Sequence, residues 1–438
     1  MLRKVVKISR TVLEGATLAR VLNPVNRGKW IVQRMQDMGP TYVKLGQFLS
    51  SRADIIGPDT IVALKELQDS SNPLPWSSVS NLIDMDQFTF IDQVPMASAS
   101  IGQVHRGKLA DGTDICIKFR RPGIVKAITG DIYLLETILN FLAMLPKQTN
   151  NSNQKMSDTQ RIVADLKAMI LNETDFVREV QNMKLMTEMY PDIRFPFPFI
   201  DMCSEDVIVM KYVPSVKLSS FNSTTTTNNS ISFRSKLAYD LMDTFIQQFL
   251  QHGMIHGDPH EGNVALSSAD ADADADASSN ANANTSASNV FVMYDLGHIV
   301  QLDAPSRSLM KILVFEIMTE NVDGVILAME NMPKIIQIRD KKQVREFVKK
   351  YIEYVKTIDV QVLSSLDSRD VNLPVQFSST VFEIVRVFGI IEGICLSLDP
   401  TFQYEKVFYK YIDTLLLDRD FLEYKAGTDL AKMWKWIT

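Results

Sequence analysis

The segment HGMIHGDPHEGN, residues 252–263, concentrates side chains that can bind a metal ion or take part in proton transfer. Its histidines, His252, His256 and His260, recur every four residues, as zinc ligands on one face of a helix would. Two glycines and a proline among them oppose such a helix, because glycine weakens a helix interior and proline breaks it. A zinc hydrolase is therefore a minor hypothesis.

A second spacing in this region is more informative. Asp258 precedes Asn263 by five residues, and Asp295 follows an apolar run in VFVMYDLGHI. In kinase-like sites an Asp and an Asn at this spacing orient the acceptor and bind magnesium, and a later Asp binds magnesium against the phosphates. The 32 positions from Asn263 to Asp295 include a 23-residue low-complexity tract at 267–289. We therefore predict two short strands whose connecting turn is lengthened by this tract.

A cation for the phosphates is expected upstream of this region. Lys118 lies inside the apolar strand-like segment ICIKFRR, where a buried ammonium group is costly without a partner. Glu179, on the predicted helix LNETDFVREVQN, is the candidate partner, by analogy with the strand lysine and helix glutamate of kinases. The pattern predicts a buried ion pair at the phosphate site.

The elements that must position these residues are of two kinds. Short β-rich segments, typical of sheet strands, lie at 88–95, 102–109, 113–121 and 206–213. Helical periodicity extends over 3–22, 28–54 with a start or kink at Pro40, 128–145, 158–190, 232–252 and most of 305–425. Polar tracts at 147–157, 219–232 and 267–289 bury too little apolar surface to fold alone and are expected to be exposed insertions. A small sheet followed by mostly helix predicts an α+β fold with two lobes.

Composition excludes several other classes of protein. The chain has 438 residues and a net charge of -6, which argues against a nucleic-acid partner. Three widely spaced cysteines predict neither a disulfide framework nor a zinc knuckle. The most apolar segments, 134–145 and 381–398, contain charged or amide residues, so no transmembrane span is expected. Residues 1–20 have the pattern of a basic amphipathic helix, which suits a transit peptide, an anionic lipid surface or an ordinary solvated helix.

Six motifs in this order resemble those of the UbiB, or aarF-domain-containing (ADCK), atypical kinase-like family. They are the Lys-x-Gly-Gln helix with Lys44, Gly46 and Gln47, the alanine-rich nucleotide loop with Ala97, Ser98, Ala99 and Ser100, the Glu-x-Asp motif with Glu173 and Asp175, the segments HGDPHEGN and YDLG, and EGICLSLDPTF at 392–402. The first five cover roughly residues 30–300, and the sixth resembles a downstream segment of the family.

This resemblance implies a bilobal protein-kinase-like fold. An N-terminal helical extension would occupy 1–85, a kinase-like N-lobe with inserted helices 86–213, and a mainly helical C-lobe 214–438 with the insertion at 267–289. It also implies ATP and Mg²⁺ as cofactors, with Asn263 and Asp295 on the metal, Lys118 on the phosphates and Asp258 orienting the nucleophile. Met210 and Tyr212 would meet the adenine at the hinge.

The implied activity is a Mg-dependent ATPase or a small-molecule or lipid kinase with restrained protein kinase activity. The restraint follows because the family's Lys-x-Gly-Gln helix covers the protein-substrate site above the Glu-x-Asp carboxylates. The implied setting is quinone or isoprenoid-lipid metabolism in a mitochondrion or plastid, peripheral to a membrane, with a homodimer or a lipid-biosynthesis complex as partner. Glu261 stands where the family usually has proline, and Lys211 replaces an expected acidic residue. A pseudokinase scaffold and an aminoglycoside- or choline-kinase-like enzyme are the alternatives, and the Lys-x-Gly-Gln helix argues against the second.

Overall fold

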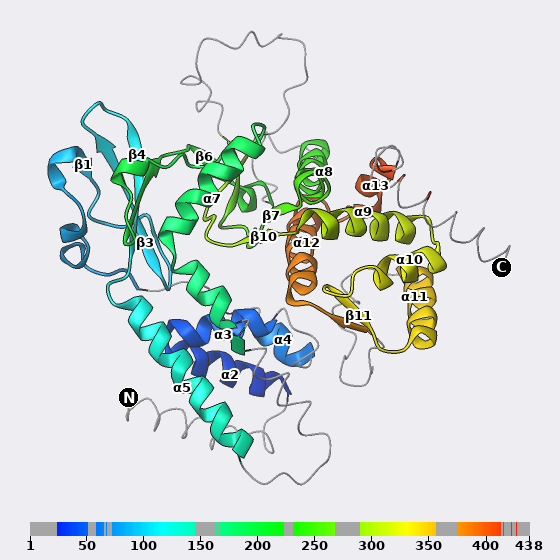
Figure 1. The fold of residues 1–438 in the computed structure, drawn as a ribbon. Coiled ribbons are helices and arrows are strands. Elements are labelled where there is room, and N and C mark those ends of the chain that lie inside the picture. Colours follow the sequence, from blue (N-terminus) through cyan, green and yellow to red (C-terminus); the bar gives the residue numbers. More distant parts are fainter. Residues whose placement is uncertain are drawn as a thin grey trace, which may run out of the picture.

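The computed structural model describes residues 24–50, 58–64, 67, 72–144, 163–164, 166–222, 231–267, 290–355 and 375–412, with positions 415, 422 and 426. The predicted helix at 3–22, the tract at 147–157 and nearly all of the tract at 267–289 lie outside these residues. Figure 1 shows a sheet-containing lobe, a mainly helical lobe and a group of helices beneath them.

The smaller lobe is built on an antiparallel sheet in the order β1-β3-β4-β5, with the short strand β2 paired to β3. Its strands are β1 (Phe88–Ile91), β2 (Ala97–Ser98), β3 (Gly102–Leu109), β4 (Asp114–Arg120) and β5 (Val207–Lys211). Side chains alternate between the two faces of a strand. Ile115, Ile117 and Phe119 of β4 therefore fill the core on one face, and Lys118 faces the opposite side.

One helix covers the face of the sheet to which Lys118 points. This helix, α7 (Phe176–Met189), begins at Asp175, whose side chain accepts a hydrogen bond from the Arg178 amide and caps the helix. The predicted continuous helix over 158–190 is therefore interrupted at Thr174 and Asp175. The break sets the direction of α7 so that Glu179, one turn into the helix, is buried toward the sheet.

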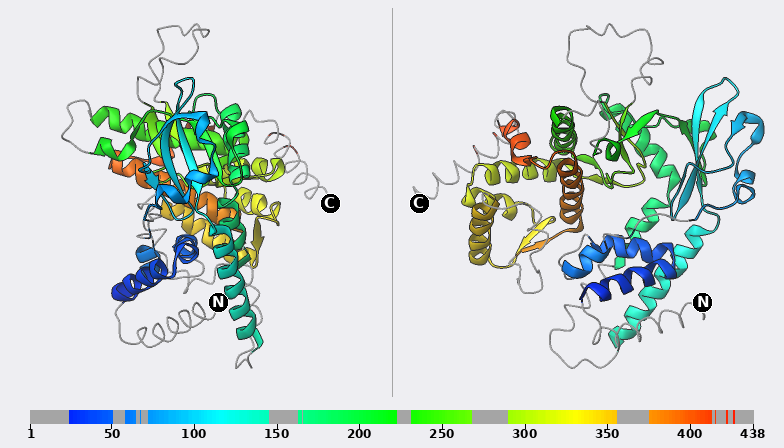
Figure 2. Two further views of the ribbon diagram at one scale, coloured as in Figure 1. Left: turned by 90° about the vertical axis from the view of Figure 1, so that its left-hand side faces the viewer. Right: turned by 180° about the vertical axis from the view of Figure 1, so that it is seen from behind.

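The helices beneath the lobes are α2 (Pro24–Met38), α3 (Pro40–Ser50) and α4 (Pro58–Leu64). The predicted break at Pro40 is present, and Gly39 provides it with a φ of +110°, which glycine adopts without steric cost. The long helix α5 (Ile124–Met144) belongs to this group, because its Ile128 packs with Phe48 of α3. The two rotated views in Figure 2 also place α5 beside the blue helices.

The larger lobe combines short strands with helices. The strands β7 (Met254–His256) and β10 (Ile299–Gln301) form one pair, β6 (Ser215–Lys217), β8 (Val264–Ser267) and β9 (Phe291–Met293) form a second sheet, and β11 (Ile336–Ile338) pairs with β12 (Val375–Phe377). The helices are α8 (Ile231–Gln247), α9 (Ala304–Met318), α10 (Val322–Glu330), α11 (Lys341–Val355), α12 (Ser379–Leu398) and α13 (Tyr404–Tyr409). The β11–β12 pair was not expected within the helical range 305–425.

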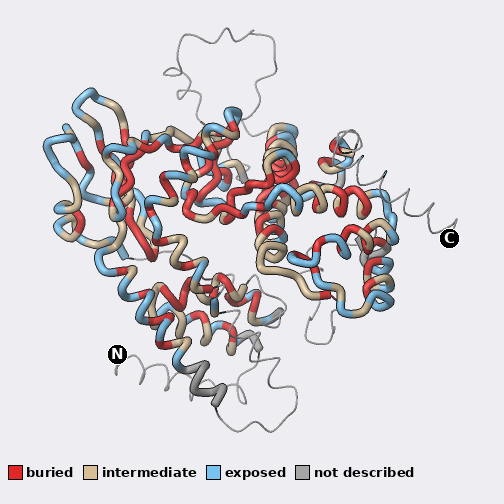
Figure 3. The backbone as a smooth tube through the Cα atoms, in the orientation of Figure 1, coloured by how far each residue is buried: buried red, intermediate tan, exposed pale blue. Residues whose placement is uncertain are grey.

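The direct pairing of β8 with β9 confirms the predicted hairpin. Val264 lies opposite Met293, and Leu266 lies opposite Phe291, so the tract at 267–289 enters the connection of two adjacent antiparallel strands. Figure 3 shows buried residues concentrated where these strands and α8 meet. Among the described helices, none combines the length and apolar composition needed to cross a bilayer.

Candidate functional site

Lys118, Glu179 and Asp295 meet between the two lobes. The Lys118 Nζ atom is 2.7 and 2.9 Å from the two carboxylate oxygens of Glu179, and 2.9 Å from Oδ1 of Asp295. The ion pair between Lys118 of β4 and Glu179 of α7, which the sequence predicted, is therefore confirmed. One ammonium group contacts two carboxylates, so the three side chains carry a net charge of −1 when both carboxylates are ionised.

Burial and charge shift the ionisation of all three groups. Burial raises the pKa of Glu179 to about 7, because Lys118 offsets only part of the desolvation and Asp295 repels the carboxylate. Desolvation also opposes ionisation of Asp295, but Lys118 more than offsets it and holds the pKa of Asp295 well below its usual range. Desolvation lowers the pKa of Lys118, and the two carboxylates raise it above its ordinary value. Asp295 is thus the carboxylate that stays ionised.

Asp295 is also conformationally distinctive. It follows β9 with a φ of +56°, in the left-handed region that few residues other than glycine, asparagine and aspartate adopt. Such a backbone persists only where its surroundings fix it, and it is common at functional sites. The turn directs the Asp295 side chain back toward Lys118, and about half of its surface remains exposed.

The loop from Gly257 to Asn263 is fixed by His256. The Asp258 amide donates to Nδ1 of His256 at 3.0 Å, and Nε2 of the same ring lies 2.7 Å from the Tyr294 carbonyl oxygen. A carbonyl only accepts, so Nε2 carries the proton and the ring is neutral. Burial agrees with this assignment, because it lowers the pKa of His256. One histidine therefore ties the loop of Asp258 to the residue that precedes Asp295.

The three histidines do not form the zinc site considered above. Both ring nitrogens of His256 are used within the protein, His252 packs edge-on against Tyr190, and His260 is exposed. Within the described residues, no group of three or more His, Cys, Asp or Glu side chains is placed to hold a metal ion. The zinc interpretation is wrong for this part of the chain.

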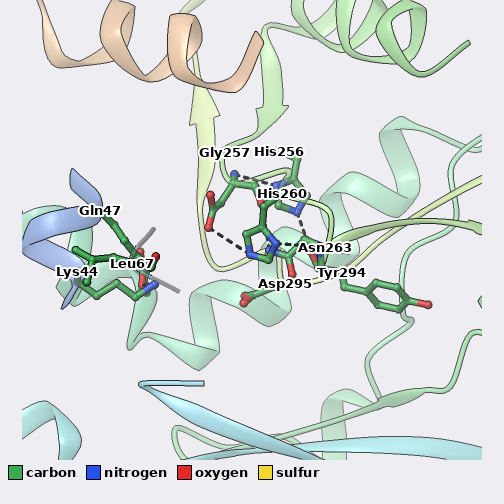
Figure 4. A network of polar contacts seen from close by, with 12 residues as sticks. Lys44, Gln47, Leu67, His256, Gly257, His260, Asn263, Tyr294 and Asp295 are labelled. Atoms are coloured by element: carbon green, nitrogen blue, oxygen red, sulfur yellow. Dashed lines mark hydrogen bonds and ion pairs between the residues drawn. The ribbon is translucent and has the colours of Figure 1, made fainter. Parts of the chain in front are cut away.

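The donor set does suit magnesium bound together with phosphates. The Asn263 side-chain amide donates to the Asp258 carbonyl at 3.1 Å, which leaves its Oδ1 as the atom available to a cation. Asp295 supplies an ionised carboxylate on the same side of the loop, as Figure 4 shows. Magnesium in phosphate-transfer sites takes one or two protein oxygens and fills its other positions with phosphate and water. Asn263 and Asp295 fit that requirement.

An arginine from the C-terminal part of the chain contacts the Asp258 loop. Arg386 of α12 donates from Nη1 to Oδ1 of Asp258 at 3.3 Å, and from Nη2 to the Gly257 carbonyl at 2.6 Å. Burial raises the pKa of Asp258, but Arg386, followed by His260 and Lys44, outweighs this effect and holds the pKa below its ordinary value. Asp258 is therefore an ionised carboxylate whose Oδ1 atom is held by Arg386.

Both polar backbone atoms of Gly257 form hydrogen bonds. Its amide donates to the His298 carbonyl at 2.9 Å, while its own carbonyl accepts from Arg386. A Cβ atom at this position would lie 2.0 Å from the His298 ring, so only glycine fits. The two contacts fix the peptide that leads directly into Asp258.

Of the predicted motif residues in the helical extension, Lys44 points toward the interlobe site and Gln47 does not. Lys44 forms a buried ion pair with Glu173, with Nζ 2.8 Å from Oε2, and its charge lowers the pKa of Asp258 and Asp295. Gln47 does not turn to the site with it, because its amide donates to the Leu67 carbonyl at 3.3 Å (Figure 4). Asp175 is exposed and caps α7, so of the two motif carboxylates only Glu173 contacts the extension.

Gly46 has a packing function in this helix. A Cβ atom there would lie 2.2 Å from Leu67 and 2.6 Å from Met35, so its absence allows α3 to approach both side chains closely. Since Gln47 also binds Leu67, this half of the motif holds the extension together. Lys44 is the motif residue that acts toward the interlobe site.

The alanine-rich loop is a tight turn clamped by an arginine. Ala97 and Ser98 form β2, and the Ala99 amide donates to the Gly102 carbonyl at 2.8 Å. Arg121 donates to the Ala99 carbonyl and to the Ser98 hydroxyl, both at 2.8 Å. The Ala99 amide is therefore not free to donate to a phosphate, and Ser100 is buried.

The two residues predicted to contact adenine, Met210 and Tyr212, lie at the end of β5. Met210 is buried opposite Cys116 of β4, and Tyr212 follows the strand with its ring 4.4 Å from the Arg106 guanidinium. The Tyr212 amide donates to the Asp114 carbonyl, and the exposed Lys211 donates from its amide to Phe197. Those two amides are therefore committed within the protein and are not free to donate to a ligand.

Sequence reasoning missed two residues that organise the site. His256 was considered only as a metal ligand, although its position two residues before Asp258 suits a ring that accepts from that amide. Arg386 is an arginine within the apolar segment VFEIVRVFGI, where a buried guanidinium needs a polar partner. That requirement is a usable signal, but nothing in the sequence indicated which distant carboxylate would satisfy it.

Comparisons with known proteins agree with this geometry. The family model described as the ABC1 atypical kinase-like domain matches residues 66–329, more than half of the chain. The chain is 23% identical over 460 residues to the Arabidopsis thaliana protein ACTIVITY OF BC1 COMPLEX KINASE 8, chloroplastic, covering 95% of this chain and 57% of that protein. It is 29% identical over 253 residues to the "Probable protein kinase UbiB" of Cellvibrio japonicus, covering 55% of this chain and 44% of that protein.

A solved structure supports the fold. The complex of Rv3197 with erythromycin from Mycobacterium tuberculosis superposes with a TM-score of 0.54 at 19% identity, covering 81% of this chain and 88% of that one. The chain spans less than two thirds of the length of these relatives: 57% of the Arabidopsis thaliana protein and 63% of a Synechocystis protein to which it is also similar. The predicted α+β kinase-like fold is confirmed, and the chain belongs to the ABC1 atypical kinase-like family, which includes proteins named UbiB and ACTIVITY OF BC1 COMPLEX KINASE.

Proposed function

We propose that this protein binds Mg-ATP between its lobes and transfers or hydrolyses the γ-phosphate. The observation that carries the proposal is the convergence of Lys118, Glu179 and Asp295 within hydrogen-bond distance, next to the loop that holds Asp258 and Asn263. The ionised Asp295 carboxylate and the side-chain oxygen of Asn263 suit a divalent cation, and the Lys118 ammonium suits the phosphates. Family membership supports the same assignment.

Each residue has a distinct part in this proposal. Asn263 and Asp295 would hold magnesium, which supplies positive charge at the phosphates when it is bound. Glu179 positions Lys118, whose ammonium would turn from Asp295 toward the α- and β-phosphates. Asp258 orients the attacking hydroxyl or water, and its low pKa keeps it an acceptor at neutral pH.

The acceptor is the finer part of the proposal. Lys44 and its partner Glu173 lie where α3 approaches the phosphate site, and this favours water or a small molecule over a protein segment. A quinone or isoprenoid-lipid intermediate at an anionic membrane surface, in a plastid or mitochondrion, is the acceptor class we propose. A homodimer or a lipid-biosynthesis complex would bring the protein to that surface. The family assignment argues against the aminoglycoside- or choline-kinase-like alternative.

The metal assignment is tested by Asp295→Asn. The wild-type protein should show a rise in thermal midpoint with Mg-ATP, and Asp295→Asn should lose it, because ligand stabilisation follows RT ln(1 + [L]/Kd). Asp201→Asn, at an exposed position in the smaller lobe, is the matched control and should keep the rise. An undiminished Mg-ATP shift in Asp295→Asn would remove the metal assignment.

Turnover is tested separately from binding. Phosphate release by the wild-type protein, with and without vesicles of anionic phospholipid, should fall by about 10²-fold or more in Asp258→Asn while the Mg-ATP shift persists. A wild-type protein that binds Mg-ATP but releases no phosphate under either condition would instead be a nucleotide-binding scaffold. Absence of both binding and release would refute the proposal.

A further inference from the structure

The contact between Arg386 and the Asp258 loop is the feature of this site that no motif contains. Arg386 lies in α12, beyond the residues 66–329 that match the family model. Its guanidinium reaches the Asp258 carboxylate through Nη1 and the Gly257 carbonyl through Nη2. A single side chain therefore binds both the proposed catalytic carboxylate and the peptide that precedes it.

The geometry of this contact restrains the loop more than a simple charge would. A guanidinium is planar and presents its donors in a fixed fork, so two acceptors that it binds are fixed relative to each other. The Asn263 amide binds the Asp258 carbonyl from the other side. Asp258 is then held at its carboxylate, at its own carbonyl and at the preceding carbonyl, and Oδ2 is the oxygen that Arg386 leaves open.

The position of Arg386 is itself fixed by packing. Ile384, Val387 and Ile391 of α12 are buried in the core of the larger lobe, where α12 packs against α8. The guanidinium side chain is 23% exposed, so water competes little for its donors. Two other groups act on the carboxylate: His260, whose Nε2 lies 3.8 Å from Oδ2, and Lys44, whose charge lowers the pKa of Asp258.

We propose that Arg386 is a positioning residue for phosphate transfer, which holds the Asp258 carboxylate in one orientation and directs Oδ2 at the acceptor. This inference rests on the proposed function. It differs from a purely structural role, because the loop keeps its contacts with His256 and His298 when Arg386 is lost, whereas the Asp258 carboxylate and the Gly257 carbonyl lose the restraint of the guanidinium. Loss of Arg386 therefore affects the chemical step more than nucleotide binding, which uses Lys118, Asn263 and Asp295.

The test compares Arg386→Ala and Arg386→Lys in the full chain. We expect kcat for phosphate release to fall by about 10²-fold in Arg386→Ala, since misorientation of a catalytic group costs this much, while KM for ATP changes less than about threefold. Arg386→Lys keeps the charge but not the fork, and should be intermediate. Arg345→Ala, an arginine on α11 that pairs with Asp323, is the control and should match the wild type.

Chemical rescue separates positioning from folding. A hollow of about 20 Å³, lined in part by Phe48, His298 and Glu383, lies beside Arg386, so truncation to alanine opens room for free guanidinium. Guanidinium at concentrations below those that unfold the protein should restore part of kcat in Arg386→Ala and not affect Arg345→Ala. If Arg386→Ala does not fold, Arg386→Lys carries the test, and kcat within twofold of wild type overturns the inference.

Failure of the proposed function gives a different result. A wild-type protein without phosphate release would refute the turnover proposal, and hydrogen exchange of residues 256–263 would then decide the contact. Faster exchange there in Arg386→Ala than in Arg345→Ala supports the positioning of the loop by Arg386. Unchanged exchange overturns it. The inference is also overturned if kcat and nucleotide affinity fall equally in Arg386→Lys and guanidinium does not rescue the alanine variant.

Discussion

Replacing Glu179 with glutamine should change how the stability of the protein depends on pH. Glu179 is 1% exposed, and burial raises its pKa from 4.5 to about 7 despite the Lys118 ammonium. Glutamine has nearly the same shape but no charge, so it removes this ionisation while it keeps the packing of α7. The wild type and Glu179→Gln therefore differ mainly in the ionisation of this one side chain.

The sign and size of the difference follow from the pKa of Glu179. The unfolded chain loses this proton near pH 4.5 and the folded protein only near pH 7, so the group's stabilising contribution is complete below pH 4.5 and is lost as the pH rises to about 7. Between about pH 5 and pH 8, linkage then predicts a loss of about 2.5 kcal/mol in the wild type that Glu179→Gln does not show. The variant gains relative stability as the pH rises.

Urea unfolding of both proteins at about pH 5 and pH 8, with EDTA and without nucleotide, measures this difference. Other titrating groups are common to both chains and cancel in the comparison. Glu188→Gln, at an exposed position on the same helix, should follow the wild type at both values. Parallel pH dependences for the wild type and Glu179→Gln would refute the argument that desolvation outweighs Lys118 at this carboxyl.

Three further predictions concern packing and the inserted tract. Gly257→Ala places a Cβ atom 2.0 Å from the rigid His298 ring and should destabilise the protein by about 1–3 kcal/mol, with reduced phosphate release, in thermal unfolding and turnover assays. Gly46→Ala meets the flexible end of Leu67 instead, so its cost should be smaller in the same unfolding assay. Replacing residues 268–289 with a two-residue Asn-Gly turn should preserve phosphate release and raise stability by about 2 kcal/mol, because β8 and β9 already pair and a shorter loop closes at a lower entropic cost. A destabilised deletion variant would show that the tract contributes contacts of its own.

Much of the fold was predictable from local signals. The strands around Lys118 follow a period of two, with Ile115, Ile117 and Phe119 on one face, so both their type and the side to which Lys118 points are readable from the residues. The β8–β9 hairpin was readable because an apolar run resumes after a tract that cannot pack. By contrast, the break before α7 depends on capping by Asp175, which the continuous helical periodicity concealed.

The candidate site was predictable as a set of residues but not as a set of contacts. Lys118, Glu179 and Asp295 meet as expected, since each lies at a defined place on a strand, a helix or a strand end. Gln47 shares a helical face with Lys44, yet its amide donates to the Leu67 carbonyl, which lies beyond the end of α4. Spacing indicates which residues share a face, and tertiary packing determines which of them reach a partner.

The dependence of Asp258 on α12 also affects the order in which the protein can become active. On the ribosome, the residues from Lys118 to Asp295 emerge well before Arg386, which is 128 positions after Asp258. A nascent chain with every family motif up to YDLG therefore has Asp258 without its contact from Arg386. In the proposed mechanism, full turnover therefore requires translation to continue past residue 386, and a premature stop before it leaves a chain with the motifs but without the restraint.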